Sequence, residues 1–159
     1  MKRVVVLSRR EIEAVRAWPV PTAVVSITDP SVRGPRANRA AIVADGHLVA
    51  LLRLAFHDTD PVRWAPEQMP TADEWAATGN AGPVAMTDEQ AASVLAFWHA
   101  TAPLVEDFVV HCEAGISRSA GVAAAICALA GLDDAWCYRE HRPNAHVKAA
   151  VLRAARAAS

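Results

Sequence analysis

A short apolar segment, a polar loop and a long uncharged segment follow one another between residues 107 and 131, and they constrain the fold more than any other part of the chain. Phe108 to Val110 is β-branched and aromatic, which predicts a buried strand. Ser119 to Leu129 contains only small or apolar residues without charge, which predicts a helix buried on most of its sides. This strand, loop and helix favour an α/β fold.

The loop between these two elements, from Cys112 to Arg118, has the composition of an anion-binding site. Backbone N–H groups at the start of a helix attract anions, and the helix dipole adds to this effect. The same positive potential favours the thiolate form of a thiol at the near side of the loop, here Cys112. Arg118 can hold two phosphate oxygens at once, and Gly115 permits the backbone twist that such a cradle needs. We therefore predict a phosphate-binding loop with a nucleophile at its base.

The context of the loop makes this prediction specific, since a cysteine followed six positions later by an arginine is a weak signal alone. A histidine, His111, directly precedes the cysteine, and a serine, Ser119, directly follows the arginine. Neither Cys127 nor Cys137 has an arginine six positions further on. The alternative is a buried structural cysteine beside an ordinary arginine.

The rest of the chain is expected to form the strands and helices that pack around the strand, loop and helix of residues 107–131. We predict further strands over residues 2–7, 23–27 and 47–56, and the hydrophobic run from Leu48 to Ala55 favours a central, parallel strand. Helices are predicted from about Arg9 to Pro19 and over 87–102, 132–140 and 144–158, with Ser8 and Thr87 as N-caps. A short element over 40–44 and a tight turn at 45–46 precede the third strand. The expected fold is α/β: a single domain over residues 1–159 with a central, mostly parallel sheet of four to five strands flanked by helices.

Composition narrows the class of function. With 159 residues, of which 53% are hydrophobic, the chain can bury a core, and its net charge of −1 gives no basic field for nucleic acid. The early apolar run from Val4 to Leu7 is too short for a signal peptide or a membrane span. Three widely spaced cysteines and six histidines without ligand spacing predict neither disulfides nor a metal site. A reactive thiol suits a reducing compartment, so we expect a cytoplasmic protein without nucleic-acid or membrane partners.

The motif His111-Cys112-x5-Arg118-Ser119 resembles the signature of the cysteine-dependent protein tyrosine phosphatases. Its late position in a short chain resembles their compact, dual-specificity-like branch. The segments LLRLAFHDTD (51–60) and HCEAGISRSAG (111–121) also resemble bacterial and phage tyrosine-phosphatase-like proteins. The good resemblance covers residues 48–60 and 105–131. It implies a tyrosine-phosphatase-like fold that hydrolyses phosphomonoesters through a phosphocysteine intermediate, with no cofactor.

The resemblance also implies roles for individual residues. Cys112 would attack phosphorus, and Arg118 would hold the phosphoryl oxygens. Ser119 would hydrogen-bond the sulfur and assist its departure, while His111 would support the thiolate structurally. The phosphate-binding residues would be Glu113, Ala114, Gly115, Ile116, Ser117 and Arg118.

An acid that protonates the leaving oxygen is also needed, and family members supply an aspartate from an upstream loop. The segment 57–60 follows the predicted third strand, and ligands of α/β sheets bind beyond the carboxyl ends of strands. Asp58 is therefore the favoured acid, Asp60 is the next candidate, and Asp73 is a further alternative.

The loop side chains indicate the substrate class. Relatives that act on phosphoinositides carry lysine in this loop, whereas Glu113, Ala114, Ile116 and Ser117 add no positive charge. We expect phosphotyrosine in proteins or peptides as substrate, extended to phosphoserine and phosphothreonine if the pocket is shallow, and phosphate or vanadate as oxyanion ligands. The alternatives are a catalytically weak phospho-residue-binding module, a sulfurtransferase and an arsenate reductase, all with the same anion loop.

Two loops have competing interpretations. Residues 31–39 carry three arginines, which form either a solvated loop or a basic rim that attracts phosphorylated substrates. Pro61 to Met86 contains four prolines, two glycines, Trp64 and Trp75, without a sustained period. This stretch is either a mobile cover that closes over the site or a static loop whose tryptophans pack on the core.

Overall fold

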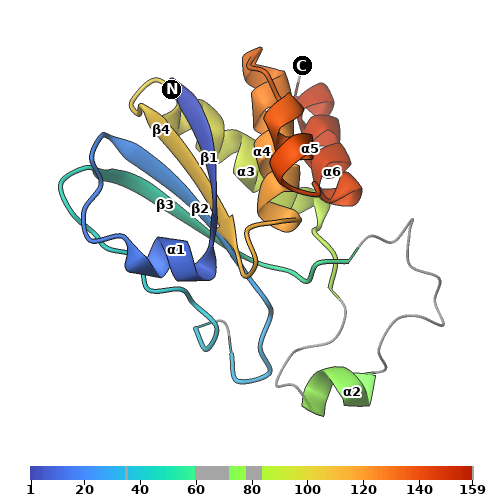
Figure 1. Cartoon of the computed structure of the whole chain (residues 1–159). Helices are drawn as coiled ribbons and strands as arrows, with labels where there is room; N and C mark the ends of the chain where they lie inside the picture. Colours follow the sequence, from blue (N-terminus) through green and yellow to red (C-terminus); the bar gives the residue numbers. More distant parts are fainter. Residues whose placement is uncertain (35, 60–71, 78–83, 159) are drawn as a thin grey trace.

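The computed structural model describes residues 1–34, 36–59, 72–77 and 84–158 (Figure 1). In this part of the chain, four strands form one sheet in the order β1-β4-β2-β3. The strands are β1 (Arg3–Ser8), β2 (Thr22–Thr28), β3 (Leu48–Ala55) and β4 (Asp107–Cys112). Every neighbouring pair is parallel, so all four carboxyl ends lie at the same edge of the sheet.

Helices cover both faces of this sheet, as Figure 1 shows. The helices are α1 (Arg9–Ala14), α2 (Ala72–Ala77), α3 (Asp88–Thr101), α4 (Arg118–Ala130), α5 (Ala135–Glu140) and α6 (Ala145–Ala157). α1 lies on one face, while α3, α4 and α6 pack on the other. The predicted single-domain α/β class with a parallel sheet is confirmed.

The alternation of side chains along β4 divides the core into two parts. Phe108 and Val110 belong to the larger cluster, which α3, α4 and α6 complete. Val109 points the other way and packs with Ile12 and Trp18 in the smaller cluster beneath α1. Since both faces are covered, every residue of the two central strands, β2 and β4, is buried.

The predicted central position of the third strand is wrong, because β3 is an edge strand in the order β1-β4-β2-β3. Its apolar run has another cause. Leu51 packs into the smaller cluster on one face, whereas Leu52 and Leu54 pack into the larger cluster on the other. Both faces of an edge strand can therefore demand hydrophobic residues, and only its outer backbone groups remain unpaired in the sheet.

Two predicted helix boundaries and one predicted short element also differ from the structure. α1 ends at Ala14 instead of continuing to Pro19, because the backbone turns extended at Val15 and Trp18 folds back into the core. Residues 40–44 form no regular element. α5 begins at Ala135 instead of 132, after the turn in which Asp133 accepts a hydrogen bond from the Ala135 amide.

The two N-caps that the sequence predicts, Ser8 and Thr87, are confirmed. Ser8 and Glu11 form a capping box on α1, and Thr87 and Gln90 form another on α3. Gly131 ends α4 in the left-handed conformation. These motifs are local, so the sequence pattern suffices to locate them.

The stretch from Pro61 to Met86 falls largely outside the described residues, and so does its proposed action as a cover. The structure describes one short helix within it, α2, together with residues 84–86. Trp64 and the side chain of Trp75 lie outside the described part. None of the helices in the described ranges is both long enough and apolar enough to cross a membrane.

Candidate active site

The loop from Glu113 to Ser117 joins the carboxyl end of β4 to the start of α4, a helix of 13 residues. Gly115 has a φ of +68°, and a Cβ atom there would lie 2.6 Å from the backbone nitrogen of Ser8. Glycine is therefore required both for the left-handed conformation and for the close approach of the loop to β1. Ser117 makes no side-chain cap on α4, which leaves the first amides of the helix without that partner.

Cys112 is buried at the end of β4, and its Sγ lies 3.1 Å from the Oγ of Ser119. Ser119 is in the first turn of α4, so the strand, the loop and the helix together fix this contact. The structure thus places the predicted nucleophile and the predicted sulfur ligand within hydrogen-bond distance.

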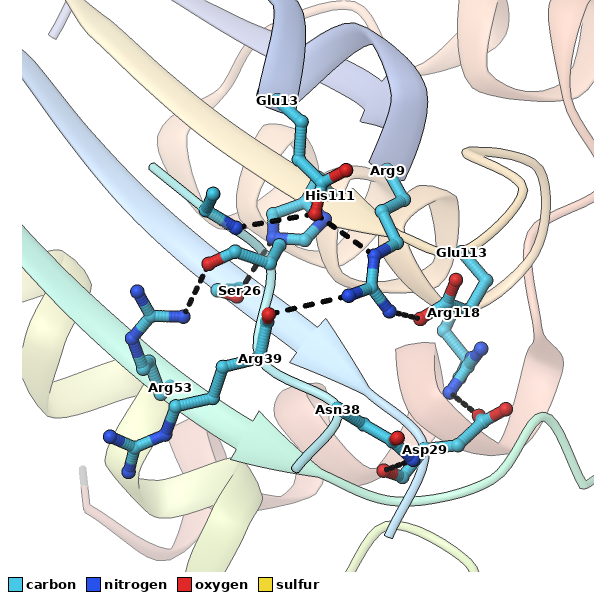
Figure 2. A network of polar contacts seen from close by, with 12 residues as sticks. Arg9, Glu13, Ser26, Asp29, Asn38, Arg39, Arg53, His111, Glu113 and Arg118 are labelled. Carbon is cyan, nitrogen blue, oxygen red and sulfur yellow. Dashed lines mark hydrogen bonds and ion pairs between the residues drawn. The ribbon is translucent and has the colours of Figure 1, made fainter. Parts of the chain in front are cut away.

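Arg118 is buried, with 4% of its surface exposed, and one of its nitrogens is held from two sides. Its Nη1 donates to Asp29 Oδ1 (Figure 2) and to the carbonyl oxygen of Phe56, both at 2.6 Å. Its Nε is buried, and no described residue gives it a hydrogen-bond partner. The guanidinium is therefore oriented through Nη1 and keeps a buried donor unused, which costs free energy until an acceptor arrives.

The segment after β2 is anchored beside Arg118. Asp29 belongs to this segment, and its carbonyl oxygen accepts a hydrogen bond from the Asn38 side chain at 3.0 Å. The carbonyl of Arg39 accepts from Arg9 at 3.3 Å. The loop with the three arginines therefore begins and ends next to the site, although its role as a basic rim stays a prediction.

The first loop residue is neutralised by an ion pair. Glu113 Oε1 lies 3.0 Å from Arg9 Nη1, and Arg9 Nε lies 3.0 Å from Glu13 (Figure 2). The Arg9 amide also donates to the carbonyl oxygen of Glu113 at 3.1 Å. These contacts tie the loop to the start of α1.

His111 lies on the opposite face of β4 from Cys112, because successive side chains of a strand alternate. It is fully buried, and its Nε2 lies 2.7 Å from the Oγ of Ser26 on β2 (Figure 2). Burial lowers the pKa of His111 to about 4; a hydrogen bond with the Cys112 backbone opposes this shift, and the cations of Arg53 and Arg9 add to it. The imidazole is therefore neutral near pH 7 and joins the two central strands.

Asp58 comes after β3 and reaches the loop. Its Oδ1 accepts hydrogen bonds from Ser117 Oγ at 2.7 Å and from Asn144 Nδ2 at 3.0 Å. The carboxylate is exposed to solvent although it contacts the loop. The structure therefore brings the favoured acid candidate to the same edge of the sheet as Cys112.

The other site candidates are placed differently. Ala114 and Ile116 are exposed on the loop, and 46% of Ile116 is accessible. Asp73 lies on α2 with an exposed side chain, and among the described residues nothing links it to the loop. Asp60 lies outside the described residues.

The sequence analysis missed two polar residues of the site, Asp29 and Asn144. The sequence around Asp29 indicates only a turn after the second strand, whereas the Asp29 carboxylate contacts Arg118 in the structure. Asn144 was interpreted only as the start of the last helix, although it also contacts the segment of Asp58. Each contact spans more than 80 residues of sequence, so no local pattern could reveal it. In the described ranges, no three His, Cys, Asp or Glu side chains are grouped so that they could hold a metal ion.

No protein-family model matches the chain, and no curated protein matches its sequence. Among solved structures, the crystal structure of human DUSP28 is similar, with a TM-score of 0.54 and 17% sequence identity. The match covers 98% of this chain and 95% of that chain. The chain has the fold of a dual-specificity phosphatase. This phosphatase-like fold agrees with the architecture that the sequence motif implied, and at this level of identity it establishes the fold alone.

Proposed function

We propose that the protein is a cysteine-dependent phosphatase that hydrolyses phosphomonoesters, in particular phosphotyrosine in proteins or peptides. The observation that carries this proposal is the buried Arg118 Nε, to which the described part of the chain offers no hydrogen-bond partner, beside a loop whose cysteine sulfur lies 3.1 Å from Ser119 Oγ. A phosphoryl oxygen is the kind of acceptor that would satisfy this donor. The phosphatase-like fold supports the same conclusion.

The first chemical step transfers the phosphoryl group to sulfur. The Cys112 thiolate attacks phosphorus in line, an S–P bond forms, and the bond to the leaving oxygen breaks. The loop amides and Arg118 stabilise the charge on the equatorial oxygens. The carboxyl group of Asp58 donates its proton to the leaving oxygen, which departs as an alcohol or a phenol.

The second step returns the enzyme to its starting state. Water attacks the phosphocysteine, its proton passes to the Asp58 carboxylate, and inorganic phosphate leaves as the S–P bond breaks. The hydroxyl group of Ser119 stabilises the thiolate that departs, which is consistent with its distance of 3.1 Å from the sulfur. His111 supports the strand that carries the cysteine and takes no part as a base, since it lies on the face of β4 opposite Cys112 and its low pKa, about 4, makes it a weak base.

The side chains of the loop guide the proposed substrate class. Glu113 is already paired with Arg9, and no lysine lies in the loop, so a second phosphate would find no added cation there. We therefore assign phosphorylated proteins or peptides as partners, with phosphotyrosine as the main substrate and dual specificity as the wider range. A cytoplasmic location and a relation to bacterial or phage enzymes are the corresponding proposals for its setting.

The test assays p-nitrophenyl phosphate, thiosulfate and arsenate side by side, with wild-type protein and with Cys112→Ser. We expect hydrolysis of the aryl phosphate only, and its complete loss in Cys112→Ser, while tungstate still raises the Tm of that variant because the cradle is intact. Turnover of thiosulfate or arsenate would instead support the sulfurtransferase or the reductase. Oxyanion binding without any turnover would identify a binding module, and residual hydrolysis in pure Cys112→Ser would refute the phosphocysteine mechanism.

A further inference from the structure

Asn144 is a buried polar residue, 6% exposed, that connects three parts of the site. Its Nδ2 donates to Asp58 Oδ1 at 3.0 Å and to the carbonyl oxygen of Thr59 at 3.2 Å. Its Oδ1 accepts from the Val147 amide at 3.0 Å and caps α6. Its own backbone amide donates to the carbonyl oxygen of Ser117 at 3.1 Å. One residue thus connects the acid segment and the last helix through its side chain, and the phosphate-binding loop through its backbone amide.

We propose that Asn144 is the positioning residue for the general acid: it fixes the Asp58 carboxyl against the phosphate-binding loop and, with Ser117, makes Oδ2 the atom that carries the transferred proton. This inference rests on the proposed phosphatase function and concerns the same site.

The choice of oxygen follows from the donors around the carboxyl group. Ser117 Oγ and Asn144 Nδ2 both donate to Oδ1 of Asp58, at 2.7 and 3.0 Å. A protonated carboxyl group has one hydroxyl oxygen and one carbonyl oxygen, and the oxygen that accepts two hydrogen bonds is the carbonyl. The proton therefore resides on Oδ2, which gives it to the leaving oxygen in the first step and regains one from water in the second.

The segment that carries Asp58 is anchored before this residue but not at it. The Phe56 amide donates to the carbonyl of Thr28 at 3.1 Å, and His57 exchanges two hydrogen bonds with Val84, at 2.7 and 3.0 Å. Asp58 itself is exposed, so only Ser117 and Asn144 hold its side chain among the described residues. Of these two, Asn144 is the buried one and also holds the next residue through the Thr59 carbonyl.

The position of Asn144 is itself set by close helix packing. A Cβ atom at Gly121 of α4 would lie 2.8 Å from the carbonyl oxygen of Asn144. The backbone of Asn144 therefore rests directly on α4, the helix that begins at Arg118. The start of α4 also carries the anion site. The contact between α4 and the Asn144 backbone therefore fixes the distance between the anion site and the Asp58 carboxyl group.

The side chain needs an acceptor for the cap and donors for Asp58, and asparagine provides both. The test therefore uses Asn144→Asp and Asn144→Ser, which retain a capping acceptor for α6 but lack the amide donors. The measurement is kcat/KM for p-nitrophenyl phosphate, a good leaving group, and for phenyl phosphate, a poor one. We expect a loss of about 10- to 100-fold on phenyl phosphate and less than about 3-fold on p-nitrophenyl phosphate, since only a poor leaving group requires the proton.

Two further variants separate positioning from folding. In an Asp58→Asn background, Asn144→Ser should cause no further loss on phenyl phosphate, because residues that act as a unit are not additive. Gly131→Ala strains the far end of α4, a helix of 13 residues that begins at Arg118, and should lower the Tm without changing the ratio between the two substrates. An equal loss on both substrates, or a full additional loss in the Asp58→Asn background, would overturn the proposal.

A readout that does not depend on turnover keeps this inference distinct from the proposed function. If the wild-type protein hydrolyses no aryl phosphate, the phosphatase function fails, but the positioning contact can still be tested. The ¹³C chemical shift of the Asp58 carboxyl group should differ between Asn144→Ser and the wild type, because the Asn144 donor 3.0 Å from Oδ1 is lost. An unchanged shift would show that Asn144 does not hold this carboxyl group and would overturn the proposal independently.

Discussion

Arg118 shows how single contacts prepare a site for an anion. Its Nη1 is occupied by Asp29 and Phe56, so the guanidinium cannot rotate freely, and Nε keeps its donor capacity. The pair with Asp29 is partly exposed, with 5% of the arginine side chain and 31% of the aspartate side chain accessible. Solvent therefore screens the attraction, and the main contribution of Asp29 is orientation.

Asp29→Ala should allow the Arg118 guanidinium to rotate away from its present orientation. We expect kcat/KM for an aryl phosphate to fall by about 10- to 100-fold, because a small misplacement of a charged group is costly in catalysis. Stability should fall by about 1–2 kcal/mol, less than for a fully buried pair. Asp29→Asn, which retains an acceptor for Nη1, is the matched control and should recover part of the activity. Tungstate should raise the Tm of Asp29→Ala less than that of the wild type, because a guanidinium that is no longer oriented binds the anion more weakly, and an equal rise would contradict this account.

The low pKa of His111 predicts that the folded protein loses stability in acid. Its pKa is about 4 in the folded protein and about 6.5 in an unfolded chain. Between these values the unfolded state binds more protons, so the free energy of unfolding must fall as the pH falls from 6.5 towards 4. The loss amounts to about 2 kcal/mol by pH 5, and buried His57, whose pKa burial also lowers, adds to it.

Urea unfolding at pH 7 and pH 5 tests this expectation. His111→Gln should show a smaller difference in unfolding free energy between the two pH values than the wild type. An identical pH dependence in both proteins would mean that His111 does not cause the acid sensitivity.

At the scale of elements, the connection from β4 to α4 depends on one glycine. The loop passes so close to the end of β1 that no Cβ fits at Gly115. The loop, β1 and α1 are further joined through Glu113 and Arg9. The shape of the anion cradle is therefore a property of three adjoining elements and not of the loop alone.

Gly115→Ala and Gly131→Ala form a matched pair for this point. Both glycines have positive φ, at +68° and +67°, but a Cβ meets backbone atoms only at Gly115. Gly131→Ala should cost about 1 kcal/mol of stability through strain and leave activity intact. Gly115→Ala should lose at least about 100-fold in kcat/KM, because the cradle must shift. Similar activity in the two variants, measured with their Tm values, would show that the close approach is unimportant.

At the scale of the whole molecule, the parallel sheet collects the site at one edge. Asp29 follows β2, Asp58 follows β3 and Cys112 ends β4, so three separated segments meet beyond the carboxyl ends of their strands. The two other cysteines, Cys127 and Cys137, lie in α4 and α5 and not at the carboxyl end of a strand. The fold thus brings one of the three thiols to the loop.

Alkylation by iodoacetate should reveal this separation. Cys112 should react first in the native protein, and vanadate should protect it by filling the cradle. Cys127 and Cys137 serve as internal controls, because they lie in α4 and α5 away from the loop, and a hydrogen bond with Cys127, followed by burial, raises the pKa of Cys137. Peptide mapping after short exposure should find label at residue 112 only. Equal labelling of all three thiols in folded protein would argue against the site.

The features that could be predicted from the sequence are those that local interactions control. The strand, loop and helix around Cys112, the capping boxes on α1 and α3, and the final helix follow from patterns within a few residues. The contact between Cys112 and Ser119, which the family resemblance implied, is also local, since the two residues are seven positions apart.

Contacts between segments that are distant in sequence are visible only in the tertiary structure. The partners of Arg118 and Asp58 include Asp29 and Asn144, which lie 89 and 86 residues away from them in sequence. The edge position of β3 was also hidden, because helices cover both faces of the sheet and an edge strand then needs the same apolar residues as a central one. Hydrophobic periodicity reports which faces are buried, whereas strand order and polar partners arise from pairing between segments, which leaves no mark on the local pattern.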